Sequence, residues 1–153
     1  RVAEALEVVG LHGYEEKVPF TLTKGERQRV AVASVLAAQP QVIILDEPTT
    51  GLDYRHQLNM MEVLKSLNRS GHTVIIITHS MWVAAEYTKR TIVLKDGCIL
   101  SDGSTRLVFA DEDLLARTSL RPSSLVQLSN WLGTQGLTVD QMVKELKNSV
   151  GDW

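Results

Sequence analysis

Two acidic residues, Asp46 and Glu47, stand directly after a run of four apolar residues, Val42 to Leu45. A run of this composition is typical of a strand buried on both faces of a parallel sheet. Carboxylates at such a place are costly without a cation, because the local dielectric is low. We interpret Asp46 as a Mg²⁺ ligand, through water, and Glu47 as the group that polarises a water for attack on a γ-phosphate. The alternative is a pair of exposed strand-end acids in a turn.

A histidine, His79, follows the next apolar run, which covers residues 73–78. A helical pattern over residues 55–68 separates the two runs, so together they predict a βαβ unit with a right-handed crossover. The carboxyl ends of parallel strands meet at one edge of the sheet, which places His79 beside Glu47. There the imidazole would hydrogen-bond the γ-phosphate. The alternative is an ordinary polar residue in a loop.

The segment Leu22-Thr23-Lys24-Gly25-Glu26 precedes an Ala- and Val-rich helix predicted over residues 26–39. The first turn of a helix offers unpaired N–H groups and the positive end of the helix dipole, which suit a phosphate. Thr23 adds a hydroxyl, and Gly25 allows a close approach of the backbone. A plain N-terminal cap, with Thr23 as the capping residue, is the simpler alternative.

The rest of the chain supplies the elements around these residues. We expect a helix over residues 1–11, a loop over residues 12–24, a second helix over residues 81–88 and a hairpin over residues 91–100. Two amphipathic stretches follow, over residues 125–132 and 139–146. The sequence therefore predicts an α/β fold with a parallel-sheet core in residues 1–117 and a small helical appendage in residues 118–153.

Composition limits the functions that fit this chain. The 153 residues carry 16 Lys and Arg against 18 Asp and Glu, and a net charge of −2 disfavours duplex nucleic acid as the main partner. Apolar runs such as Val42 to Leu45 are far shorter than the roughly 20 residues that span a bilayer. A lone Cys98 excludes an internal disulfide and fits a reducing compartment, so we expect a cytoplasmic protein. The chain begins at Arg1 inside a helical pattern, and we expect a longer protein around it.

In order and spacing, four segments resemble motifs of the ABC-type ATPases. Val42 to Pro48 resembles the Walker B strand with its catalytic glutamate, and Thr49 to Asp53 resembles the D-loop. His79 falls at the switch histidine, and Leu22 to Glu26 falls at the signature motif. The resemblance runs through most of residues 20–103. It implies a RecA-like core, ATP and Mg²⁺ as cofactors, and ATP hydrolysis by the full-length protein.

The resemblance also assigns the candidate residues to two ATP sites. The residues implied to act on this domain's own ATP are Asp46 for Mg²⁺, and Glu47 and His79 for catalysis. The residues implied to contact ATP held by a partner domain are Thr23, Lys24, Gly25 and Glu26. Asp53 falls at the seam of the dimer. The signature departs from the family's Leu-Ser-Gly-Gly-Gln, because Thr, Lys and Glu stand at its second, third and fifth positions.

The phosphate-cradling Walker A motif is absent, because none of the ten glycines is followed by lysine. We expect this motif upstream, and we predict that the isolated chain neither binds nor hydrolyses ATP appreciably. The D-loop favours transport, and residues 120–128 resemble ATPase components of energy-coupling factor importers for vitamins or for cobalt and nickel. The resemblance implies a subunit on the inner face of the cell membrane. Its implied partners are integral membrane transport subunits and a second ABC ATPase domain, which in this branch can be fused in the same chain.

Two alternatives stay open. One is a non-transport ABC ATPase acting on DNA or ribosomes, although nucleic acid is not an expected partner. The other is a regulatory, catalytically weak half that completes a partner's site. The transported substrate is not encoded in any pattern of this sequence.

Several other residues have purely structural interpretations. We expect Trp131 to pack the appendage, and we expect four apolar side chains to lie against the core of the ATPase: Leu125, Leu128, Val139 and Met142. Three histidines have no metal-ligand spacing, and we expect them to be solvated: His12, His56 and His72.

Overall fold

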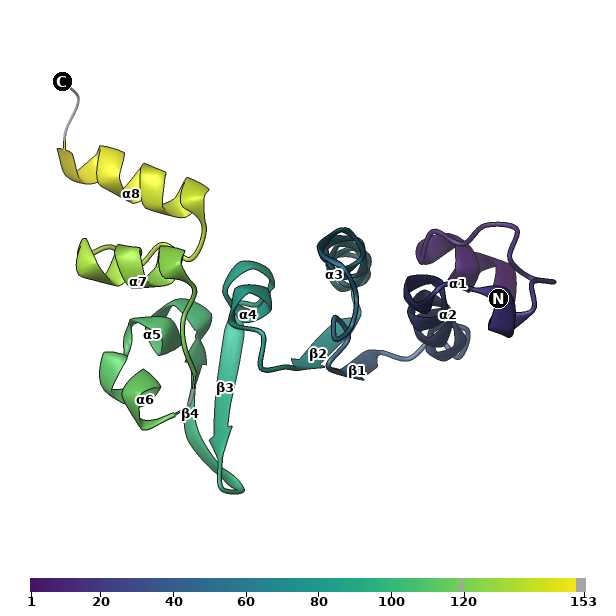
Figure 1. Ribbon diagram of the computed structural model, residues 1–153, viewed down its shortest axis with the longest axis horizontal. Helices are drawn as coiled ribbons and strands as arrows, with labels where there is room; N and C mark the ends of the chain where they lie inside the picture. The colour runs from purple at the N-terminus through teal and green to yellow at the C-terminus, as the bar shows by residue number, and fades with distance from the viewer. Residues whose placement is uncertain (119, 151–153) are drawn as a thin grey trace. The chain divides into compact units, whose positions relative to one another are not determined.

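The computed structural model describes residues 1–118 and 120–150 (Figure 1). The chain divides into two compact units, Arg1–Thr78, here called unit 1, and His79–Trp153, called unit 2. Over the described ranges, no helix combines the length and the apolar composition needed to cross a bilayer.

Unit 1 holds a parallel strand–helix–strand arrangement, as the sequence predicts. Its elements are α1 (Val2–Val8), η1 (Pro19–Thr21), α2 (Lys24–Leu36), β1 (Val42–Asp46), α3 (Tyr54–Arg69) and β2 (Thr73–Ile77). β1 and β2 pair in parallel, with Val42 opposite Thr73 and Asp46 opposite Ile77. α3 joins the two strands and lies along one face of their sheet (Figure 1). The side chains that α3 buries recur at helical spacing: Met60, Met61, Leu64 and Leu67.

Among the residues that the structure describes, α3 covers one face of the sheet of unit 1 and the other face is exposed, so the prediction that β1 is buried on both faces was wrong. Ile43 is 3% exposed, whereas its neighbours Val42 and Ile44 are 50% and 63% exposed. Ile75 and Ile77 of β2 share the face of Ile44 and are 45% and 53% exposed. Because α3 packs on the opposite side, these four branched side chains form an exposed apolar face.

The helix α2 covers residues 24–36 rather than the predicted 26–39. It starts earlier because Thr23 supplies the cap one residue before Lys24. It ends earlier because the backbone turns at Gln39, whose φ is 52°, just ahead of Pro40. α1 packs against α2.

Unit 2 combines a hairpin with short helices. Its elements are α4 (Met81–Tyr87), β3 (Arg90–Lys95), β4 (Cys98–Ser104), α5 (Thr105–Ala110), α6 (Glu112–Arg117), α7 (Ser124–Trp131) and α8 (Val139–Val150). β3 and β4 are antiparallel, with an irregularity between Val93 and Leu94. Asp96 and Gly97 form the two-residue turn with φ of 51° and 77°, the conformation that Asp-Gly favours in a hairpin. The structure confirms the hairpin that the sequence predicts.

The core of unit 2 is drawn from five of its elements. Its buried members are Ala84, Ala85, Val93, Val108, Phe109, Leu114, Leu115 and Val126. α7 contributes Val126 and Ser129, one helical turn apart, to the buried side. Its other side carries Trp131 and Leu128, which are 82% and 44% exposed. Val139 of α8 is 59% exposed, so the predicted packing of these last three side chains was wrong.

Phe109 fills this core and is 1% exposed. We expect Phe109→Ala to lower the free energy of unfolding by about 3–5 kcal/mol, because the lost ring leaves a cavity. The matched control is Leu107→Ala in the same helix, where the side chain is 62% exposed and the expected change is below about 0.5 kcal/mol. Urea denaturation followed by tryptophan fluorescence measures both, since all three tryptophans of the chain come after residue 79. Equal losses for the two variants would contradict this description of the core.

Candidate functional site

The carboxyl ends of β1 and β2 form the first part of the candidate site. Asp46 is the last residue of β1, and its side chain is exposed. Glu47 follows with a φ of 47°, a left-handed conformation that costs a residue with a Cβ about 1–2 kcal/mol. The Glu47 N–H donates to the carbonyl of Ile77 at 2.8 Å. The regular strand therefore stops at Asp46, while the next residue stays attached to β2.

The carboxylate of Glu47 accepts two hydroxyl groups at one oxygen. Thr50 Oγ1 donates to Glu47 Oε2 at 3.1 Å, and Thr78 Oγ1 donates to the same oxygen at 3.3 Å. Thr50 belongs to the turn after β1, whereas Thr78 follows β2 directly. The sequence interpretation missed both contacts. Threonines shortly after the ends of both strands were the signal available.

The turn between Glu47 and Asp53 is held by two glutamine side chains. Gln28 Nε2 of α2 donates to the carbonyl of Pro48 at 2.7 Å. Gln57 Nε2 of α3 donates to the carbonyl of Leu52 at 3.0 Å. Sequence reasoning found neither, because a side-chain bond to a distant backbone carbonyl leaves no spacing pattern.

Asp53 begins α3 as its N-terminal cap. Its Oδ1 accepts the backbone N–H of His56 at 2.9 Å, and its Oδ2 lies 2.7 Å from His56 Nδ1. These contacts, chiefly the one from the His56 backbone, hold the pKa of Asp53 below its ordinary value. His72 Nδ1 lies 2.7 Å from the carbonyl oxygen of Pro40. Both histidines are hydrogen-bonded and partly buried, although the His56 side chain is still 40% exposed, and His12 is exposed as predicted.

The start of α2 is closed by a reciprocal pair of hydrogen bonds. Thr23 Oγ1 accepts the Glu26 N–H at 3.3 Å, and Glu26 Oε2 accepts the Thr23 N–H at 2.7 Å. The hydroxyl of Tyr14 donates to Glu26 Oε1 at 2.8 Å. These donors, the Thr23 N–H above all, lower the pKa of Glu26 to about 2. The capping alternative for Thr23 is therefore confirmed, and the phosphate contact of this segment stays a prediction.

Two glycines bring the start of α2 against the turn before α3. A Cβ on Gly25 would lie 2.8 Å from Cδ2 of His56, so only glycine fits this approach without a shift. Gly51 has a φ of 71°, and a Cβ there would lie 1.9 Å from Nζ of Lys24. The segments predicted as signature and D-loop are therefore neighbours within unit 1.

His79 follows Thr78 as the first residue of unit 2, and it is exposed. Its expected approach to Glu47 stays a prediction. Over the described residues there is no cluster of three or more His, Cys, Asp or Glu side chains that would hold a metal by itself. The exposed carboxylate of Asp46 nevertheless fits Mg²⁺, because this ion is commonly held by one or two carboxylates together with substrate phosphates and water.

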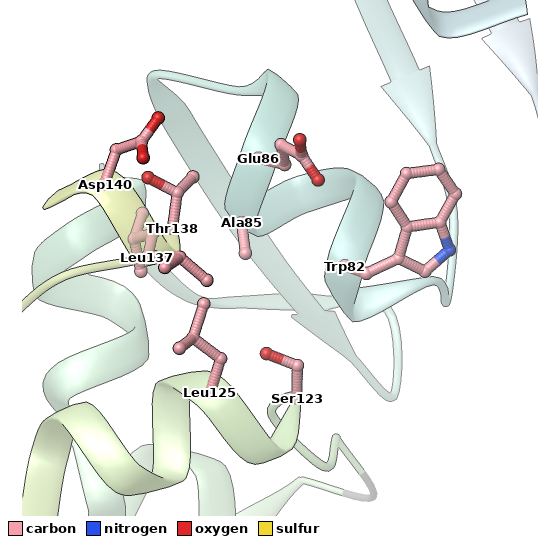
Figure 2. A pocket seen from close by; sticks show the side chains of 9 residues that line it. Trp82, Ala85, Glu86, Ser123, Leu125, Leu137, Thr138 and Asp140 are labelled. Carbon is pink, nitrogen blue, oxygen red and sulfur yellow. The ribbon is translucent and has the colours of Figure 1, made fainter. Parts of the chain in front are cut away.

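Unit 2 has a hollow of about 340 Å³ away from these residues (Figure 2). Its lining consists of Trp82, Ala85, Glu86, Ser123, Leu125, Leu137, Thr138, Val139 and Asp140. Leu125 and Leu137 point into the hollow, and the indole of Trp82 lies at one edge (Figure 2). None of these nine lining residues belongs to the predicted ATP site.

Known proteins share both the sequence and the fold of this chain. The family model described as ABC transporter matches residues 1–50. The structure of cbiO1 from Clostridium perfringens, part of the ABC transporter complex cbiONQ, has a TM-score of 0.67 and 34% identity, over 83% of this chain and 51% of that one. A dimeric ATP-binding cassette with ADP and phosphate has a TM-score of 0.58 and 36% identity, over 67% of this chain and 44% of that one. The chain is therefore similar to ABC-type ATPases over most of its length, and it has their RecA-like α/β fold.

Two curated relatives indicate which ABC-type ATPases this chain resembles. An ABC transporter ATP-binding protein of Caldanaerobacter subterraneus is 58% identical over 143 residues, which make up 94% of this chain and 25% of that protein. The energy-coupling factor transporter ATP-binding protein EcfA of Methanothermobacter thermautotrophicus is 39% identical in an alignment of 157 positions, which covers 99% of this chain and 50% of that protein. The chain thus spans a quarter and a half of the length of these relatives, and the resemblance to energy-coupling factor ATPases is confirmed.

The capping box at Glu26 predicts a pH-dependent contribution to stability. The pKa of Glu26 is about 2 in the folded chain against an ordinary 4.5, so the ionised group stabilises the fold above about pH 4.5. This contribution is lost as the pH falls from about 4.5 to about 2. The urea midpoint of wild type should exceed that of Glu26→Gln by more at about pH 7 than at about pH 3. Glu16→Gln, in an exposed loop, controls for the loss of one charge. A difference that is independent of pH would show that these bonds do not favour the ionised form.

Proposed function

We propose that this chain is the part of an ABC importer's ATP-binding subunit that carries the catalytic glutamate and the signature motif. In the full-length protein, ATP hydrolysis would drive transport through a membrane partner of the energy-coupling factor type. The observation that carries the proposal is the end of β1, where Asp46 is exposed and Glu47 is held by hydroxyls from both sides of the sheet edge. The likeness to EcfA supports the branch.

At this domain's own ATP, we assign three residues. Asp46 would hold Mg²⁺, which supplies positive charge to balance the phosphates. Glu47 accepts a proton from the attacking water and so raises the nucleophilicity of its oxygen. His79 donates a hydrogen bond to the γ-phosphate.

At the ATP of a partner domain, the start of α2 provides the contacts. Backbone N–H groups at the helix start and the ammonium of Lys24 are directed to the phosphates. Gly25 lets the backbone approach closely. Glu26 acts through Thr23, because its carboxylate is engaged in the capping box and fixes the geometry of the cap. Asp53, exposed at the start of α3, lies at the seam between the two domains.

The proposed partners follow from the two ATP sites, because this domain contributes residues to its own site and to that of a partner. A second ABC ATPase domain, separate or fused in the same chain, completes each ATP site. Integral membrane subunits carry the substrate, and the ATPase lies on the inner face of the cell membrane. Support comes from relatives, since one solved cassette is a dimer and cbiO1 is part of a transporter complex.

A regulatory half that completes the site of an active partner is the second candidate. The capping box favours it, because the Thr23 hydroxyl and both oxygens of Glu26 are already used within the loop. Such a loop offers a partner's ATP fewer polar groups than a glycine-rich signature. The regulatory half and the importer motor differ in whether ATP is hydrolysed at the site that contains Glu47.

Glu47→Gln separates the two candidates. In the full-length protein with its membrane subunits, the steady-state Mg-ATPase rate should fall by at least about 100-fold, because the amide cannot accept the proton from water. Glu62→Gln is the control, since this exposed glutamate of α3 pairs with Lys65 and stands outside the site. An unchanged rate for Glu47→Gln would mean that turnover occurs at another site, and the regulatory half would then be the better explanation.

The chain of residues 1–153 by itself is expected to show no tight binding of Mg-ATP. The sequence has no Walker A motif, so the loop that cradles the phosphates is missing from it. Isothermal titration of the 153-residue chain with Mg-ATP, beside the full-length protein, tests this directly. Binding of equal strength by both would show that the residues described here hold the nucleotide without that loop.

A further inference from the structure

The pairing of β1 with β2 does not by itself fix the orientation of the Glu47 side chain. In a regular strand the pleat directs each side chain to one face, but Glu47 has a φ of 47° and lies beyond the last regular residue. Its backbone is fixed by its own N–H bond to the Ile77 carbonyl at 2.8 Å and by the Thr50 N–H, which donates to its carbonyl at 3.1 Å. Three side-chain torsions remain to be fixed by other groups.

Two threonines provide that restraint from separate segments of the chain. Thr50 reaches the carboxylate from the turn, and Thr78 reaches it from the end of β2. Both hydroxyls donate to Oε2. Together the two bonds restrict the rotation of the carboxylate.

We propose that Thr50 and Thr78 are positioning residues that hold the Glu47 carboxylate in the orientation in which it accepts a proton from the attacking water. The proposal rests on the proposed role of Glu47 as proton acceptor. In this role, the orientation of Glu47 depends on the pairing of β1 with β2, because Thr50 follows β1 and Thr78 follows β2. Neither threonine needs to touch ATP for this role.

The test replaces each threonine by valine, which keeps the shape and removes the hydroxyl, and by serine, which keeps the hydroxyl. The enzyme is the full-length protein with its membrane subunits, and kcat and KM for Mg-ATP are measured separately. We expect kcat to fall by about tenfold in each valine variant, because a misplaced base loses alignment with the water. KM should change by less than about twofold, and serine should restore kcat to within about twofold of wild type.

A second arm uses the Glu47→Gln background. If the threonines act through the carboxylate, Thr50→Val should have no further effect on kcat once that carboxylate is gone. Thr73→Val is the matched control, because Thr73 is exposed at the opposite end of β2 and should leave kcat unchanged. Thr50 is exposed in a turn, so its valine variant keeps the test valid even if Thr78→Val does not fold.

Several outcomes would overturn the proposal. A valine variant with normal kcat and raised KM would make the threonine a contact for the nucleotide. Failure of serine to restore kcat, or an equal valine effect in the Glu47→Gln background, would make the role purely structural. A large effect of Glu47→Gln with unchanged valine variants would refute the positioning role and leave the proposed function intact. No effect of Glu47→Gln would refute both.

Discussion

The parallel pairing of β1 with β2 determines where the candidate catalytic groups lie. The register sets Asp46 opposite Ile77, and the N–H of Glu47 continues the pairing one residue past the regular strand. Because Thr78 is the next residue after Ile77, the same register brings its hydroxyl to the Glu47 carboxylate. A slip of one residue would reverse the faces of all these side chains. The pairing of the β1 and β2 backbones thus determines the geometry of the candidate site.

A second set of contacts joins the start of α2 to the turn that follows Glu47. Gln28 holds the carbonyl of Pro48, while Gly25 packs on the ring of His56. In the proposed assembly these two segments serve different ATP molecules, one held by this domain and one by its partner. The two segments are therefore in direct contact through Gln28 and Gly25.

The sequence indicated where the candidate catalytic residues lie in the fold, but it indicated little about the contacts around them. The apolar runs placed β1 and β2 each to within one residue, so the positions of Asp46 and Glu47 at a strand end could be predicted from local pattern alone. The contacts of Gln28 and His56 could not, because each joins residues whose proximity depends on how the helices pack. Trp131 shows a further limit, since an amphipathic pattern identifies an apolar side of a helix without identifying what covers it. In the same way, the apolar run of β1 indicates a buried strand without showing whether one face or both faces are covered.

The exposed apolar face of unit 1 affects how the chain behaves before folding is complete. Within the described residues, β1 and β2 each have an outer edge with no strand beside it, next to the branched side chains of Ile44 and Ile75. Open edges and a flat β-branched surface favour pairing between chains. Such pairing is second order in concentration, whereas folding within one chain is first order. For the 153-residue chain by itself, the yield of correctly folded protein should therefore decrease as the protein concentration rises.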